Sequence, residues 1–409
     1  TRQRWLFRMV HSPRPLQEKM ALFWHNYFAT GYDKVAGQIG SNGASRAFGA
    51  KPSEEDYGVR GQYELFREYA LGNFRDLLIE VSRDPAMVAW LDGDTNVRAK
   101  PQENYARELM ELFTMGVDFF TESDVYAGAR VFTGWNLRNF YPNDDDRYST
   151  FRFRSSQHDT DSKTFSFPIY PDGGKTIPAR SAGSGQQDGL DLINAVAAHP
   201  ETGPRLARKL YAFFVSELKT PPESFIQQLA GVYYSSGYDM RAVVGSLLRS
   251  AEFQDPANYF ARYSWPVEYV TRLLKAVGWT GFSASNATTP LANMGQVLFE
   301  PPDVSGWRLG TDWFSTGTLL ARMNFAATLV SNQQFRLLSD ALPSAGTPES
   351  LFAYMRDRLA PADYDTQASN DLLNYLYAGA AWTGEEVQVR IKAAGLARLI
   401  GGSSEYQFV

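Results

Sequence analysis

The apolar residues along most of the chain recur at the spacing of an α-helix. In residues 15–28, the large apolar side chains share one side of such a helix: Leu16, Met20, Phe23, Trp24 and Tyr27. At about 100° per residue, His25 falls on the opposite side, together with Glu18 and the small Ala21. A histidine that leaves the apolar side of its helix suits a cleft and suits an ordinary surface equally well.

Local end signals predict further helices in the first third of the chain. Asp84-Pro85 is typical of a helix start, since Asp caps the backbone N–H groups and Pro fits the first turn. Pro101 to Gly116 forms the clearest helix, and Thr121-Glu-Ser-Asp124 approximates the capping box that opens the next one. Gly72-Asn73 predicts a break between two helices. Gly37 to Asp56 is rich in small and polar residues, so we expect a flexible connection there.

Residues 136–189 differ from the rest of the chain. They contain acidic turn residues, the alternating Phe151-Arg-Phe-Arg154 and a Gly/Pro/Ser-rich tract, which predict a loop excursion with one β-hairpin. Helical patterns return after this excursion and continue to the C-terminal end, near 190–198, 202–218, 222–235, 239–251, 265–277, 289–299, 311–330, 348–359, 365–376 and 384–399.

These patterns predict an all-α fold of about sixteen helices. We expect one large helical domain over 1–409, with an N-terminal helical part (1–135), the irregular excursion (136–189) and a C-terminal helical part (190–409). Two helical layers and a toroid-like arrangement are both compatible with this pattern.

Composition narrows the class of protein. The 409 residues are 44% hydrophobic and 21% charged, a globular balance, and the net charge of −5 with scattered Lys and Arg argues against nucleic acid as a partner. No apolar run is long enough for a membrane span. The absence of cysteine excludes disulfides, thiolate metal sites and cysteine nucleophiles. Because the chain begins at Thr1 without a Met or a signal segment, we expect a trimmed or processed form, with more of the protein encoded upstream.

Carboxylates and one histidine are the candidate catalytic groups. Paired carboxylates are the raw material of glycoside hydrolysis or of a carboxylate-rich metal site, and the candidates for hydrolysis are Glu103, Glu108, Glu111 and Asp303. His25 is the candidate for general acid or base work. The alternative for the helical carboxylates is an ion-pair ladder, because Arg107 is four residues from both Glu103 and Glu111.

Aromatic and polar residues near predicted turns are the candidate substrate-binding groups. His158 and Asp159 lie in the excursion, and loops on a rigid scaffold commonly carry binding residues. Tryptophans can line a saccharide cleft, although beside Pro and Gly turns they equally fasten loops onto a core. The predicted binding set is Asn26, Arg107, Trp135, His158, Asp159 and Trp307. No metal-site or dinucleotide motif occurs, so we expect neither a metal nor a cofactor.

Several segments together resemble a known bacterial family. They are Phe23–Phe28, Asp84–Met87, Glu103–Phe113, Ala129–Trp135, His158-Asp159 with Lys163-Thr164, Arg208–Leu210, Pro266–Glu268, Pro301–Trp307 and Leu320–Phe325. On these residues the chain is similar to the family catalogued as domain of unknown function 1800. The match spans most of 15–330, and the final eighty or so residues fit more loosely.

The resemblance implies a place outside the cytoplasm. Members of that family look exported, and many begin with a signal peptide and a helical region containing an Arg-Thr-Gly-Phe-Gly-like element, neither of which this sequence contains. Their genes often sit beside one for a sulfatase-like exported protein. We therefore expect an exported hydrolase acting on a polysaccharide or oligosaccharide. The alternative is a non-enzymatic binding or assembly partner of an exported sulfatase-like protein.

Overall fold

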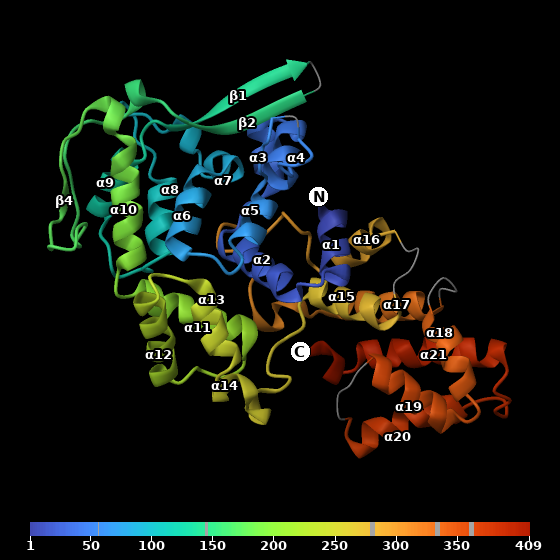
Figure 1. Ribbon diagram of the computed structural model, residues 1–409. Coiled ribbons are helices and arrows are strands. Elements are labelled where there is room, and N and C mark those ends of the chain that lie inside the picture. Colours follow the sequence, from blue (N-terminus) through green and yellow to red (C-terminus); the bar gives the residue numbers. More distant parts are fainter. Residues whose placement is uncertain (56, 144–145, 279–282, 332–335, 360–363) are drawn as a thin grey trace.

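The computed structural model describes residues 1–55, 57–143, 146–278, 283–331, 336–359 and 364–409. Figure 1 shows a mostly helical molecule in which a β-hairpin extends along one edge. The predicted all-α class is confirmed: the described residues form 21 α-helices and two small two-stranded sheets.

The described residues of the N-terminal part form nine α-helices. In chain order they are α1 (Arg2–His11), α2 (Pro15–Tyr27), α3 (Tyr32–Ile39), α4 (Ser41–Gly49), α5 (Gln62–Glu68), α6 (Phe74–Arg83), α7 (Pro85–Trp90), α8 (Asn104–Glu111) and α9 (Glu122–Val131). The predicted break at Gly72-Asn73 and the start at Asp84-Pro85 are confirmed, with Asn73 and Asp84 as side-chain caps. Thr121 and Asp124 form both bonds of the capping box.

The predicted flexible connection over Gly37 to Asp56 is wrong for most of its described residues, and Asp56 itself lies outside them. Two helices, α3 and α4, begin before or within this stretch. Their apolar residues, sparse in sequence, are buried against the rest of the fold: Val35, Ile39, Ala44, Ala47 and Phe48. Packing therefore overrides the weak local preference of Gly, Ser and Asn for a loop.

Helix α2 lies near the middle of the molecule, between the N-terminal helices and α15 (Figure 1). Its apolar side contacts other elements through aromatic rings: Phe23 meets Phe213 of a later helix at 5.3 Å, and Trp24 meets Phe74 of α6 at 5.7 Å. The Tyr27 hydroxyl donates to the carbonyl of Phe113, just after α8. Helix α2 is thus held by packing on several sides.

The excursion over 136–189 contains two hairpins where one was predicted. Strands β1 (Trp135–Asn143) and β2 (Asp146–Phe153) pair antiparallel, with Trp135 opposite Phe153. The shorter β3 (Lys163–Thr164) and β4 (Thr176–Ile177) form a second antiparallel pair. Two residues per strand give too short an alternation to be recognised in the sequence.

The remaining helices follow the excursion. They are α10 (Gln186–Ala198), α11 (Thr202–Phe214), α12 (Glu223–Ser235), α13 (Met240–Leu248), α14 (Ala251–Gln254), α15 (Pro266–Ala276), α16 (Ser285–Asn293), α17 (Thr316–Ser331), α18 (Arg336–Ala341), α19 (Pro348–Leu359), α20 (Thr366–Tyr377) and α21 (Glu386–Gly402). In Figure 1, α18 to α21 gather beside α17, away from the hairpins.

One large cluster of buried apolar residues runs from Trp5 to Tyr406 and includes side chains of both helical parts. A toroid-like arrangement is not shown, and the predicted division into one domain with an excursion stays a prediction. Among the described helices, none combines the length and the apolar character needed to cross a membrane.

Candidate functional site

His25 lies in a closed aromatic environment. Its side chain has no solvent exposure, and its ring is within 5.5 Å of the rings of Trp5, Phe299 and Trp307. Its Nε2 accepts a hydrogen bond from the Phe299 backbone N–H at 3.0 Å. Burial lowers the pKa of His25 to about 3, so the ring is neutral at physiological pH. These contacts favour a structural role, and the catalytic role stays a prediction.

The expected ladder on α8 forms only in part. Arg107 pairs with Glu103 at 3.3 Å, as predicted. Its second carboxylate is Glu122 of α9, at 2.6 Å, rather than Glu111. The pair with Glu122 cannot be read from spacing along α8, because Glu122 belongs to the next helix. Arg107 and Glu122 therefore tie α8 to α9 at the surface, in a contact of the kind that contributes little to stability.

Glu108 and Glu111 are left without a described cation of their own. Burial, followed by the negative charge of Glu111, raises the pKa of Glu108 to about 7. A carboxyl group that keeps its proton near neutral pH beside a second carboxylate has the protonation state of a general acid.

His158 and Asp159 belong to a buried polar network that fastens the excursion to α9 and α10. Asp159 accepts two hydrogen bonds from Arg130 of α9, at 2.8 and 3.0 Å. The fully buried Asp188 of α10 accepts from Lys163 at 2.6 Å and lies 3.2 Å from His158 Nε2. These contacts hold the loop in place, and a substrate-binding role for His158 and Asp159 stays a prediction.

Trp135 and Asp303 also have structural contacts. The Trp135 ring packs against Phe132 and Phe151 at 5.2 and 5.1 Å, and only 3% of the residue is exposed. Asp303 is exposed in the loop after Phe299, where its carboxylate accepts from the backbone N–H of Ser305 at 2.8 Å. This carboxylate shapes its own turn.

Two of the predicted residues, Asn26 and Trp307, line a common cleft. The α2–α11 cleft has a volume of about 310 Å³ and lies between α2, α11 and the loop 305–309. Asn26 fixes the loop by accepting from the Trp307 backbone N–H at 2.7 Å. Gly306 makes this approach possible: its φ is +87°, and a Cβ there would lie 2.5 Å from Asn26 oxygens.

The charge of the α2–α11 cleft is positive. Three basic residues line it, Arg208, Lys209 and Arg308, and none of its described lining residues is acidic. Glu223 pairs with Arg208 at 2.8 Å from outside the cleft. Arg308 is 3.9 Å from Asp312, but 79% of its side chain is exposed, so this contact neutralises little charge.

Lys209 is the most distinctive side chain of the cleft. Part of the residue is exposed to solvent, while its ammonium lies in the cleft, 5.6 Å from the centre of the Tyr27 ring. Within the described parts of the chain it has no carboxylate partner. Desolvation by the cleft walls, followed by the charge of Arg205, lowers the pKa of Lys209 to about 8. The lysine is therefore mostly protonated at neutral pH and available to an anionic ligand.

The sequence prediction missed Lys209 as a site residue. The signal was present: α11 contains Arg205, Arg208 and Lys209 and no acidic residue. The other predicted site residues do not line this cleft. Within the described ranges, no group of three or more His, Asp or Glu side chains is placed to hold a metal ion.

The fold and this cleft define a large helical protein with a basic, partly aromatic hollow beside its central helix. The chain belongs to the family described as "Protein of unknown function (DUF1800)", whose model matches residues 1–408. No curated protein and no solved structure matches the chain. Three segments that carried the resemblance meet at the cleft: Phe23–Phe28, Arg208–Leu210 and Pro301–Trp307.

Proposed function

We propose that this chain binds an anionic carbohydrate polymer in the α2–α11 cleft. The observation that carries the proposal is the unpaired Lys209 in a cleft lined by two further cations and, among its described residues, no carboxylate. Such a positively charged lining attracts the carboxylate or sulfate groups of a ligand. The volume of about 310 Å³ suits a short stretch of a longer polymer.

The aromatic and amide groups of the cleft support a sugar as the carrier of those anionic groups. Phe23, Tyr27 and Trp307 supply ring surface, which packs against the C–H faces of a pyranose. The Asn26 side chain uses its oxygen to fix the Trp307 backbone, so its NH₂ group is available to a hydroxyl of the ligand. Cations, rings and an amide donor together match an acidic sugar better than a bare inorganic anion.

The test is polymer binding by affinity gel electrophoresis. We expect polygalacturonate, alginate or a sulfated galactan to retard the protein, and dextran of equal size to leave its mobility unchanged. Lys209→Gln combined with Arg308→Gln should weaken retention at least tenfold. Lys100→Gln is the matched control, because Lys100 is exposed and lies outside the cleft. Equal retention of the double variant and the control would refute the site.

A second candidate function is hydrolysis of such a polymer, favoured by the state of Glu108. A carboxyl group with a pKa of about 7 is poised to donate a proton to a leaving oxygen, and Glu111 supplies a second carboxylate on the same helix. Release of reducing ends by the wild type, lost in Glu108→Gln and kept in Glu122→Gln, is the expected result. If Glu108→Gln keeps full activity, this assignment is wrong.

Export, and a sulfatase-like exported partner, complete the proposal through the family resemblance alone. In the alternative function, the chain binds the polymer or the partner without catalysis. If the polymers that retard the protein release no reducing ends when incubated with it, this alternative is favoured over hydrolysis.

A further inference from the structure

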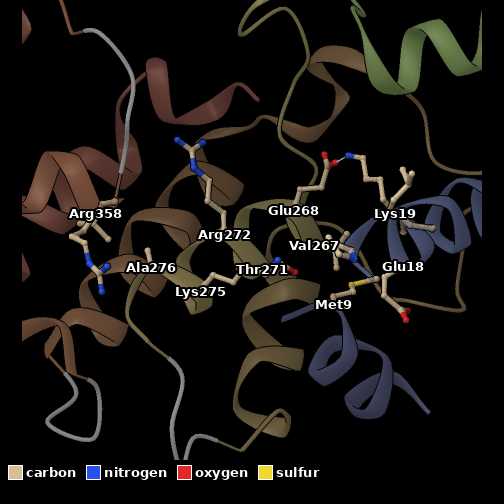
Figure 2. Close-up of a pocket in the computed structure, with 14 residues that line it drawn as sticks. Met9, Glu18, Lys19, Val267, Glu268, Thr271, Arg272, Lys275, Ala276 and Arg358 are labelled. Atoms are coloured by element: carbon tan, nitrogen blue, oxygen red, sulfur yellow. Dashed lines mark hydrogen bonds and ion pairs between the residues drawn. The ribbon is translucent and has the colours of Figure 1, made fainter. Parts of the chain in front are cut away.

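A second and larger hollow lies against the first half of α2, whereas the α2–α11 cleft lies against the end of that helix. The α2–α15 cavity has a volume of about 730 Å³ and is lined by residues of α1, α2, α15 and the end of α19 (Figure 2). It shares no lining residue with the α2–α11 cleft. A volume in this range is typical of sites for small organic molecules.

Most of the cavity wall is apolar. The apolar lining comes from Met9, Leu16, Leu22, Val267, Ala276 and Leu359. These side chains belong to four different helices, so the wall is a concave surface and not the exposed stripe of one helix. Such a wall favours a hydrocarbon chain, because each buried methylene contributes about 0.8 kcal/mol.

The carboxylates of the cavity are already used by the protein. Glu268 pairs with Lys19 and with Arg262, and it accepts from the Trp265 backbone N–H at 3.0 Å. Glu18 accepts from the Tyr63 hydroxyl at 2.9 Å and from Arg67 at 2.8 Å. Neither carboxylate is therefore free to attract a cationic ligand.

The unused charge of the cavity is positive. Lys275 has no hydrogen-bond or ion-pair partner within the part of the chain that the structure describes, and it is exposed. Arg272 donates through one nitrogen to the Phe408 carbonyl and stacks on Tyr406, which leaves further N–H groups available. Figure 2 shows Arg272, Lys275 and Arg358 toward one end of the cavity, and the Lys19–Glu268 pair toward the other.

We propose that the α2–α15 cavity binds a single-chain amphiphile with an anionic head group. Its hydrocarbon chain lies along the apolar wall between α2 and α15, and its carboxylate or phosphate meets Lys275, Arg272 and Arg358. This site is independent of the carbohydrate proposal, since the two hollows are lined by different residues.

The test is isothermal titration calorimetry of the whole chain with decanoate, dodecanoate, dodecyl phosphate and the neutral 1-decanol. We expect one molecule bound per chain, with dodecanoate at least tenfold tighter than decanoate because of its two extra methylenes. Decanoate should bind at least tenfold tighter than 1-decanol, because only decanoate carries the charged head. A separate set of titrations uses vesicles of an anionic diacyl lipid that contain no lysolipid. It distinguishes a monomeric ligand from a membrane surface.

Variants separate the chain site from the head site. Ala276→Phe fills the cavity and should abolish binding of all four amphiphiles. Leu16→Trp serves the same purpose if the first variant does not fold. Lys275→Gln with Arg358→Gln should erase the preference for decanoate over 1-decanol. Lys100→Gln and Lys209→Gln should bind as the wild type does.

The proposal is overturned by unchanged binding in both cavity-filling variants, by equal affinity for decanoate and 1-decanol, or by no saturable binding of any chain. Binding to vesicles without binding to the monomeric amphiphiles would also overturn it, in favour of a surface for membranes. If the protein binds the amphiphiles but none of the polymers, only the carbohydrate proposal is refuted.

Discussion

Replacing Asp188 by Asn should release the excursion from the helical body. The Asp188 carboxylate accepts from Lys163 at 2.6 Å and from Arg180 at 2.7 Å, and it lies 3.2 Å from His158 Nε2. Asn keeps one acceptor oxygen and presents an NH₂ group to the same donors. The buried Lys163 therefore loses its nearer counter-charge and keeps only the Asp159 carboxylate, at 3.7 Å. Removing one partner of a buried ion pair costs about 3–5 kcal/mol.

The assay is hydrogen exchange of the backbone amides over residues 158–188, followed by mass spectrometry. A loss of about 3 kcal/mol in local opening energy corresponds to exchange that is faster by about two orders of magnitude. Asp161→Asn is the control, since Asp161 is exposed in the same excursion. Wild-type exchange in Asp188→Asn, with the control also unchanged, would refute the view that this network holds the excursion.

The same carboxylate gives the prediction a pH dependence. Burial alone raises the pKa of Asp188, but hydrogen bonds from His158 and Lys163 outweigh burial and lower it. Its contribution to stability is therefore present above the unfolded value of about 3.9 and is lost as the pH falls through the lower folded value. Acidification below about pH 4 should lower the protection of these amides, relative to their intrinsic exchange rates at the same pH, more in the wild type than in Asp188→Asn.

Three further predictions concern individual titrating groups. Burial lowers the pKa of His25 to about 3, so the folded protein binds a proton less readily than the unfolded chain. In urea unfolding, the wild type should therefore lose up to about 1.4 kcal/mol of stability per pH unit as the pH falls from roughly 6 to 3. His25→Gln should flatten this slope, and an unchanged slope would contradict the prediction. The pKa of Glu108 is raised to about 7, so its contribution to stability is fully present below about pH 4.3 and is lost as the pH rises through 7. Glu108→Gln should therefore raise the urea midpoint at pH 8 and leave it unchanged at pH 4. Lys209, with a pKa of about 8, should lose its charge between pH 7 and 9, so polymer retention should fall over this interval in the wild type and stay level in Lys209→Gln.

Features that depend on neighbours in the sequence were predictable. The caps at Asp84 and Thr121 act on backbone N–H groups within three residues, and both form as expected. The break at Gly72-Asn73 follows from the same kind of local rule, because Asn73 caps the next helix. Such interactions need no knowledge of the tertiary fold.

Features that depend on distant partners were not predictable. The side of α2 that carries His25 was identified, but what covers it is Phe299, 274 positions later, and Trp307. Likewise, the basic character of α11 was present in the sequence, whereas the meeting of Lys209 with Asn26 and the loop 305–309 exists only in the folded chain. Periodicity assigns a side chain to a face of its helix, and the partner of that face comes from packing.

Helix α2 connects the two proposed sites through one stripe of its surface. Lys19, Phe23 and Asn26 follow each other at spacings of four and three residues, which places them on one side over about 10 Å of helix. Lys19 lines the cavity and Asn26 lines the cleft. Between them stands Phe213, whose ring contacts Phe23 at 5.3 Å and lies 4.6 Å from the Lys19 ammonium.

Phe213 lines the cleft and contacts Lys19, a lining residue of the cavity. It is 3% exposed, and Arg262, the partner of Glu268, lies 5.2 Å from the centre of its ring. A buried ring with two cations and a second ring as close neighbours has little room to move, because close-packed neighbours occupy the space around it. Ligands in the two hollows should accordingly bind with additive free energies, and a coupling between them would require Phe213 to shift.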